Sequence, residues 1–374
     1  MAGIYIHIPF CRQACHYCDF HFSTTLKHQQ AMVDAICQEL VLRKAELADE
    51  ITTLYFGGGT PSLLSAQQLQ QIFNTLSQNY KLTNDLEFTL EANPDDISDS
   101  LLTAYKAIGV NRLSLGIQSF KEKDLRFMNR AHNEQQARKA LNLISEQFDN
   151  YSIDLIYGVP EMSLESWQQN LETAFEAGVP HLSCYALTVE PDTALDRFIQ
   201  KGVVAPADEA LAKAHYDLLL SMTQQAGYEN YEFSNFGKPG FHSKNNTAYW
   251  EGVPYLGIGP GAHSLVAHTR SWNVSNNVLY IKALQDSKRP HQSETLSMND
   301  RYNEYIMTGL RTAKGVSLPK IVADFGLVYR EYAESLLPEL QAKQWIFLDG
   351  DTLHVPKDAK FLSDGIAAEL FKLL

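Results

Sequence analysis

Three cysteines stand close together near the start of the chain, in the pattern C-x-x-x-C-x-x-C formed by Cys11, Cys15 and Cys18. Thiolates are the soft ligands that iron–sulfur clusters and zinc select, and cysteines at this spacing can converge on one metal centre. Most closed metal sites use four protein ligands, so a site with three cysteines leaves one metal position open. We therefore predict a cluster in which a small molecule coordinates one iron.

Two other interpretations of these cysteines have to be weighed. Disulfides are not expected, because the chain has five cysteines, an odd number, and shows no export signal. Zinc would need a fourth ligand, which His16 or His21 could supply from the same stretch. Cys37 and Cys184 lie in a helical and a strand pattern, where we expect a thiol to act as a small buried apolar group.

Six short hydrophobic runs that alternate with helical patterns must position this loop. The predicted strands are residues 3–8, 51–56, 86–91, 112–117, 151–156 and 181–186. The predicted helices include 25–49, 65–80, a helix capped by Asp96 or Ser98 that runs to Gly109, one that begins at Asn133, 163–178 and 208–227. This alternation predicts an α/β fold, an incomplete TIM-like parallel (β/α)6 barrel that is open on one side.

Polar and glycine-rich stretches follow the ends of several predicted strands. In parallel barrels the chemistry gathers at the C-terminal ends of the strands, so residues at these ends are expected to share one site. They are the cysteine loop, residues 57–60, Glu91, Gln118 and residues 157–160.

The second half of the chain has a different pattern. Residues 228–264 are rich in glycine, asparagine and aromatic residues, and the run Gly257-x-Gly259-x-Gly261 lacks the strand–turn–helix context of a phosphate loop. We expect a tight connection there. Predicted helices at 299–310, 317–325 and 329–343 precede a predicted hairpin at 345–355 that turns at Asp349-Gly350.

These patterns divide the chain into three predicted parts. Residues 1–235 form the barrel, 236–297 a connecting segment, and 298–374 a small helical, winged-helix-like domain expected to cover the mouth of the barrel.

Composition limits the environment and the partners. The net charge of −13, without a block of lysine and arginine, argues against a nucleic-acid or anionic-membrane surface. No apolar run approaches the roughly 18 residues of a membrane span. The first predicted strand begins at Gly3, which leaves no room for a targeting peptide, so we expect the reducing cytoplasm.

The cysteine pattern after one strand and Gly57-Gly-Gly-Thr-Pro61 after the next resemble the radical S-adenosylmethionine (SAM) superfamily. More narrowly, residues 4–11, 115–120, 129–130 and 153–160 resemble the oxygen-independent coproporphyrinogen III oxidase family, most densely over residues 1 to 190. The resemblance implies that Cys11, Cys15 and Cys18 hold a 4Fe–4S cluster whose open iron binds SAM. Once reduced, such a cluster can cleave SAM to a 5′-deoxyadenosyl radical.

The same resemblance implies which residues contact the cofactor. Contacts with the cluster-bound SAM are implied for Tyr5, Gly58, Gly59, Thr60 and Glu91, with Ala186 near the adenine. Glycines at 57–59 are expected to let the backbone approach the methionine moiety. Gln118, Arg130 and Asp154 match positions that hold a second SAM in the oxidase branch. Considered alone, Asp154 would be a satisfied polar residue of a barrel strand, and Arg130 a surface charge.

Two departures separate the chain from the oxidases. Phe20 stands where their pattern has a fourth cysteine, and the chain starts directly at the cluster strand. Both features resemble the sister branch of haem chaperones (HemW), which implies binding of haem and its delivery to acceptor proteins.

That branch also carries an H-N-x-x-Y-W stretch linked to haem. Asn246, Tyr249 and Trp250 match it, but Asn245 replaces the histidine. An asparagine amide is a poor iron ligand, so His242, His263 or a cysteine is left as the candidate haem ligand. The two aromatic residues are equally consistent with simple packing.

The main prediction is a haem chaperone that uses a 4Fe–4S cluster, SAM and haem, with haem-accepting proteins and an electron donor as partners. The alternatives are a coproporphyrinogen III oxidase, which decarboxylates its substrate by hydrogen abstraction, and a radical enzyme that acts on an unrelated substrate. No catalytic residue and no oligomeric state is assigned.

Overall fold

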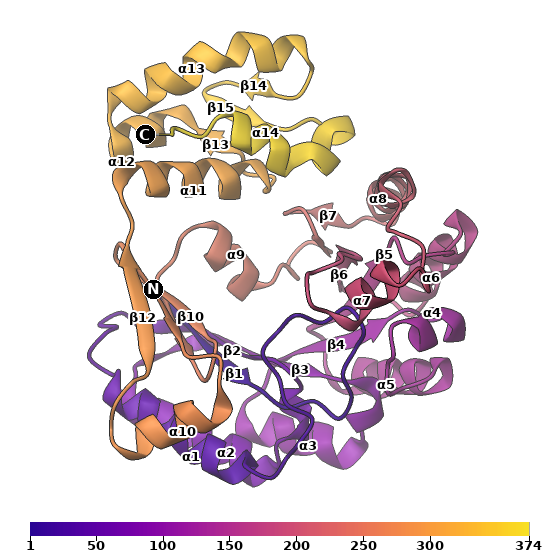
Figure 1. Cartoon of the computed structure of the whole chain (residues 1–374), viewed down its shortest axis with the longest axis vertical. Helices are drawn as coiled ribbons and strands as arrows, with labels where there is room; N and C mark the ends of the chain where they lie inside the picture. Colours follow the sequence, from indigo (N-terminus) through magenta and orange to yellow (C-terminus); the bar gives the residue numbers. More distant parts are fainter. Residues whose placement is uncertain (374) are drawn as a thin grey trace.

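The six predicted strands form a continuous parallel sheet that curves into a partial barrel (Figure 1). The computed structural model describes residues 1–373. Both faces of most strands are buried, as is typical of parallel sheets covered by helices. The predicted partial barrel is confirmed, with the strands β1 (Ala2–Ile8), β2 (Ile51–Gly58), β3 (Leu82–Ala92), β4 (Arg112–Gln118), β5 (Tyr151–Tyr157) and β6 (His181–Ala186).

Capping residues set where the covering helices begin. Ser98, not Asp96, accepts a hydrogen bond from the Leu101 amide, and Ser65 and Asn133 form capping boxes. Gly109 ends its helix with a φ of 108°. The helices are α1 (Gln29–Leu42), α2 (Ala66–Asn79), α3 (Asp99–Ile108), α4 (Glu122–Phe127), α5 (Glu134–Gln147), α6 (Leu164–Glu176), α7 (Ala194–Gln200) and α8 (Glu209–Gln225), with 3-10 turns at Pro61–Leu63 and Pro94–Asp96.

The prediction of one helix over residues 25–49 was wrong at both ends, because α1 is shorter. Ser23 Oγ accepts a hydrogen bond from the Thr25 amide at 3.3 Å, so this stretch turns before the helix starts. At the other end, the Arg43 guanidinium turns inward to Glu39 and Glu46, and the backbone leaves the helix there.

Strands from residues 229–295 extend the sheet at both edges to twelve strands. β9 (Tyr255–Ile258) lies parallel to β1, and β10 (His263–Val266), β11 (Thr269–Asn273) and β12 (His291–Thr295) follow antiparallel. The other edge carries β7 (Glu229–Asn230) and β8 (Asn235–Gly237). Gly257 therefore lies in a strand that was not predicted, and the tight turn comes after it. A Cβ there would stand 2.0 Å from the His263 carbonyl oxygen, so only glycine fits.

Two helices accompany these edge strands. They are α9 (Lys244–Trp250), which lies between the barrel and the C-terminal residues in Figure 1, and α10 (Asn277–Gln285), which packs on α1.

The C-terminal residues form their own hydrophobic cluster above the barrel (Figure 1). The predicted helices and hairpin are confirmed, but the hairpin turns at Gly350-Asp351, one residue later than predicted, because Asp349 still pairs with Thr352. Gly350 has the positive φ of 57° that this turn requires. The elements are α11 (Met298–Leu310), α12 (Leu318–Phe325), α13 (Leu327–Ala342), α14 (Ser363–Glu369), a 3-10 turn at Lys357–Leu362, and a small sheet of β13 (Val316–Ser317), β14 (Phe347–Asp349) and β15 (Thr352–His354). Across residues 1–373, we find no helix with the length and hydrophobicity of a bilayer span.

Candidate functional site

A cavity of about 590 Å³ opens where the parallel strands end. The cysteine loop forms one wall, the ends of β2 to β6 form the floor, and two residues of the C-terminal domain, Arg311 and Asp364, complete the rim. The predicted site residues that line it are Cys11, Cys15, Cys18, Gly58, Gly59, Thr60, Glu91, Gln118, Arg130, Asp154 and Ala186.

The three cysteines are partly exposed to this cavity and unpaired. Thr60 Oγ1 lies 3.6 Å from Cys11 Sγ, and Arg130 Nη1 donates a hydrogen bond to Cys15 Sγ at 3.2 Å. Burial raises the pKa of Cys11, and raises that of Cys18 to about 12, so binding of a metal would release protons from these thiols.

The two histidines considered as a fourth zinc ligand already have hydrogen-bond partners. His16 Nδ1 lies 2.8 Å from the Phe127 carbonyl oxygen, and His21 Nε2 lies 2.8 Å from Asn277 Oδ1. Within residues 1–373, no group of three or more His, Cys, Asp or Glu side chains converges as the ligands of a single metal ion. A cubane cluster binds each thiolate at a different iron, so its cysteines need not converge on one point.

Glu91 is held at the end of β3 by two donors. The Tyr55 hydroxyl donates to Oε1 at 2.7 Å, and the Gly58 amide donates to Oε2 at 3.2 Å. Burial, with a further contribution from the charge of Asp154, raises the pKa of Glu91 to about 7. The carboxyl group is therefore fixed in place and poised between its two protonation states near neutral pH.

The glycines at 57–59 are required by contacts within the protein itself. A Cβ on Gly57 would stand 2.9 Å from Glu91 Oε1, and one on Gly58 2.3 Å from His7 Nδ1. A Cβ on Gly59 would stand 2.6 Å from the Phe10 carbonyl oxygen. These contacts are sufficient to require glycine at all three positions.

Gln118 at the end of β4, Asp154 within β5 and Arg130 in the loop between α4 and α5 lie around the same cavity. Arg130 is not the surface charge that it would be if considered alone, because its Nη2 donates to Asn93 Oδ1 at 2.6 Å and to the Gly116 carbonyl at 2.9 Å. Asp154 accepts a hydrogen bond from Ser114 Oγ at 3.2 Å, and burial raises its pKa to about 6. Gln118 has a φ of 64°, a strained conformation that is often found at binding sites.

Tyr5 is not among the residues that line the cavity in the described chain. Its ring stacks on that of Tyr55 with centroids 6.0 Å apart, and its hydroxyl lies 3.2 Å from His7 Nδ1. Tyr5 therefore reaches the site through Tyr55, which in turn binds Glu91.

The implied haem residues lie on or beside α9, next to the cavity and not in its described wall. Tyr249 packs edge-on against Tyr255 with centroids 4.5 Å apart, and the Trp250 ring lies 5.4 Å from the Arg311 guanidinium. Asn246 lies in the first turn of α9, where its backbone N–H donates to Ser243 Oγ. Asn245 is buried, and its backbone N–H donates to Glu87 Oε1 at 2.9 Å.

The two candidate haem-ligating histidines differ in their surroundings. His242 stacks on Tyr231 with centroids 4.3 Å apart, and its Nε2 lies 3.0 Å from Glu229 Oε2. His263 is exposed, stacks on Trp272 at 5.9 Å, and forms no side-chain hydrogen bond with the residues that the structure describes. Its pKa is lowered by partial burial and by the charge of Arg270, which favours the neutral imidazole that binds metals.

Several cavity residues escaped the sequence analysis. Asn93 follows the end of β3 directly, and Ser114 and Tyr185 face inward from predicted strands, so strand alternation could have found them. Phe233, Arg311 and Asp364 had no such signal, because they reach the cavity from later segments.

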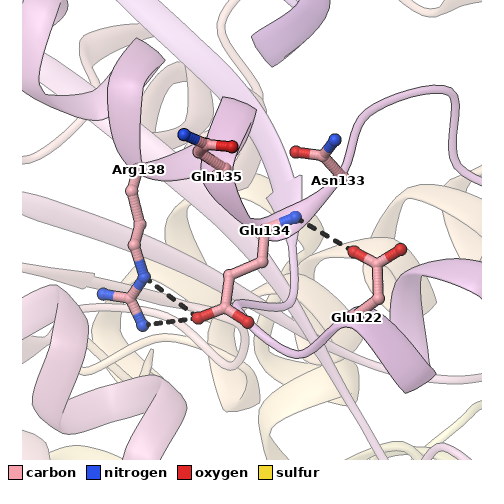
Figure 2. A pocket seen from close by; sticks show the side chains of 5 residues that line it. All are labelled: Glu122, Asn133, Glu134, Gln135 and Arg138. Atoms are coloured by element: carbon pink, nitrogen blue, oxygen red, sulfur yellow. Dashed lines mark hydrogen bonds and ion pairs between the residues drawn. The ribbon is translucent and has the colours of Figure 1, made fainter.

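A second, shallow depression of about 410 Å³ lies at the start of α5 (Figure 2), and none of the three cysteines is among its lining residues. Its charges satisfy one another: Arg138 donates to Glu134 Oε1 at 3.0 Å, and the Glu134 amide donates to Glu122 Oε2 at 3.3 Å (Figure 2). The charged side chains of this depression therefore stabilise the first turn of α5, and no ligand is needed to explain them.

Comparisons with known proteins agree with this geometry. The model of the Radical SAM superfamily matches residues 5–174, and that of the HemN C-terminal domain matches residues 296–362. The chain is 32% identical to the heme chaperone HemW of Bacillus subtilis over 98% of both chains. It is 38% identical to HemW of Escherichia coli over 87% of this chain and 86% of that protein.

A solved structure shows the same fold. The coproporphyrinogen III oxidase HemN from Escherichia coli, a radical SAM enzyme, superposes with a TM-score of 0.87 over all of this chain and 90% of that one. The two sequences are 24% identical, so this likeness concerns the fold alone.

Proposed function

The chain belongs to the HemW heme chaperone family within the radical SAM superfamily, and from this membership we propose that it binds haem and passes it to acceptor proteins. The observation that supports the proposal is that α9 lies beside the cavity that contains the cysteines. The aromatic end of α9, the stretch that resembles the haem-linked motif, meets the cavity rim at Arg311.

Cys11, Cys15 and Cys18 are proposed to hold the 4Fe–4S cluster that superfamily membership implies. Three partly exposed thiols on one cavity wall, with the Arg130 charge beside one of them, support this assignment. When bound and reduced, the cluster with SAM supplies one-electron chemistry, which requires an external electron donor. Arg130 would offset the negative charge of the thiolates.

SAM is proposed to occupy the part of the cavity between this loop and the ends of β2 to β6. Fixed carboxylates suit its cationic and hydroxyl groups, because an ionised carboxylate only accepts hydrogen bonds. The proposed contacts are Gly58, Gly59, Thr60, Glu91, Gln118, Arg130, Asp154 and Ala186, with Tyr5 acting through Tyr55. The domain assignment proposed with them is a barrel of residues 1–235, a connecting segment of residues 236–297 and a covering domain of residues 298–374.

We expect SAM affinity to rise with pH. The pKa of Glu91 is about 7 in the folded chain, so below that pH most of its carboxyl groups are protonated and have lost the negative charge that attracts the cationic groups of SAM. Binding at pH 6 should be about tenfold weaker than at pH 8, because each pH unit below a pKa reduces the ionised fraction about tenfold. Equilibrium dialysis with SAM at a series of pH values measures this.

The matched variant is Glu91→Gln. It should bind more weakly and lose the part of the pH dependence that Glu91 contributes. The amine of SAM also titrates near pH 8 by the usual value of about 7.7–8.0 for an α-amino group, and it does so equally in both proteins. Parallel pH profiles for the wild type and the variant would exclude Glu91 as the contact.

Haem binding is the direct test of the proposed function. Titration of haem into the reconstituted protein should give a saturable Soret shift, and reconstituted protein loaded with haem should transfer it to an apo-haem protein. His263→Ala is expected to weaken binding more than His242→Ala, because His263 is exposed and neutral while His242 lies against Glu229. Absence of a saturable shift in the wild type would end the proposal, and equal effects of the two variants would reject His263 as the ligand.

A further inference from the structure

A guanidinium group from the C-terminal domain reaches the wall of the barrel cavity. Arg311 directly follows α11, and its side chain lines the cavity together with Phe233 and Asp364. The side chain is only 18% exposed. A charge removed from water in this way requires partners of the opposite sign or a ligand that supplies them.

The two arginines of the cavity differ in their partners. Arg130 already donates to Cys15 Sγ, Asn93 Oδ1 and the Gly116 carbonyl oxygen. Among residues 1–373, Arg311 forms an ion pair with the Asp364 carboxylate and with no other, and the Asp364 side chain is 68% exposed, so this ion pair contributes little. The Arg311 Nε is buried and has no hydrogen-bond partner among the described residues. Arg311 therefore has donor capacity left for an anion.

Aromatic faces hold the Arg311 fork in position. The centre of the guanidinium lies 4.7 Å from the Phe233 ring and 5.4 Å from the Trp250 ring. Such stacking leaves the edge of the guanidinium free for a planar, bidentate acceptor such as a carboxylate. Phe20 and Tyr185, which are 65% and 45% exposed, add apolar surface to the same cavity.

The guanidinium edge of Arg311 and the apolar surface beside it would both be matched by a flat, largely apolar molecule with a carboxylate at its edge. We propose that Arg311 binds a propionate carboxylate of haem and displaces Asp364 when it does so, an inference that rests on the proposed function. Trp250 then contributes to haem binding by positioning Arg311, in addition to any direct contact between Trp250 and haem.

The test compares haem with its dimethyl ester, which keeps the macrocycle and the iron but lacks both carboxylates. Arg311→Gln should weaken haem binding about 10- to 100-fold, the range for loss of a charge-assisted hydrogen bond. Arg311→Lys keeps the positive charge but not the planar pair of donors, so its haem affinity should lie between those of the wild type and Arg311→Gln. The ester should bind the wild type and Arg311→Gln with equal affinity. Lys314→Gln removes a different contact between the domains, the ion pair with Glu251, and should leave haem affinity unchanged.

Each result of this comparison has a definite meaning. If the wild type does not bind haem, the proposed function fails and this inference fails with it. If the wild type binds haem and Arg311→Gln binds it equally well, the inference alone is overturned. If the variant loses affinity for haem and for the ester to the same degree, Arg311 only supports the domain contact, and the propionate assignment is rejected.

Discussion

Replacing Cys15 by alanine is expected to abolish assembly of the iron–sulfur cluster and, with it, SAM binding at the open iron. Loss of an outer hydrogen-bond partner alone costs a metal site about 10- to 100-fold in affinity, so loss of one of three ligands should exceed that range. Cys15 also accepts the hydrogen bond from Arg130, which the substitution removes. Iron and sulfide content after anaerobic reconstitution, with the visible absorption of the cluster, measures the effect.

Cys37→Ala is the matched control, because Cys37 is a partly buried thiol on α1 outside the cavity. It should retain a full cluster. If Cys15→Ala assembled a cluster as completely as the wild type, the three-cysteine assignment would be contradicted. Stoichiometric zinc in anaerobically purified wild type would contradict the assignment of an iron–sulfur cluster to these cysteines.

The barrel could be predicted from sequence because its signals are local. Each of the six strands is a short hydrophobic run, and residues such as Ser98 and Asn133 mark the helix starts by capping them. A parallel barrel then implies one functional end, which is why residues as distant in sequence as Cys11 and Asp154 could be assigned to one site.

The edges of the sheet could not be predicted, because their pairing is not local. β9 is a four-residue strand that contains Gly257, and its partner β1 lies some 250 residues earlier in the chain. Short strands with glycine have weak β propensity, so tertiary contacts decide such a segment. The same reason explains why Arg311, which enters the cavity from another domain, was missed.

The glycines at 57–59 are also required by contacts within the protein that the sequence analysis did not include. The cofactor argument needs only that a ligand comes near the backbone. In the structure, the closest atoms to a Cβ on Gly58 or Gly59 belong to His7 and Phe10. Contacts between strand ends that are adjacent in space cannot be recognised in a single sequence. The glycines that these contacts require can be recognised there.

The buried carboxylate of Glu39 ties the unpredicted edge strands to the barrel. It is fully buried on α1 and accepts hydrogen bonds from Arg43, the Gly259 amide at 2.9 Å and Asn273. The Tyr280 hydroxyl of α10 also donates to it, at 2.5 Å. Gly259 lies directly against His7, so this network also fixes the turn beside the strand that carries the cysteine loop.

Glu39→Ala should therefore lower the free energy of unfolding by about 3–5 kcal/mol, because it breaks a buried ion pair with Arg43 and leaves the Gly259 amide and the Tyr280 hydroxyl without their acceptor. The Arg43 side chain left behind is 1% exposed and keeps the partly exposed Glu46 carboxylate as a partner. Glu46→Ala removes the other carboxylate that binds Arg43, but Glu46 is 39% exposed, so it should cost at most about 1 kcal/mol. Chemical denaturation followed by circular dichroism compares the two variants. Equal losses would show that the ion pair with Arg43, and not the burial of Glu39 among the edge strands, determines the stability of this side of the barrel.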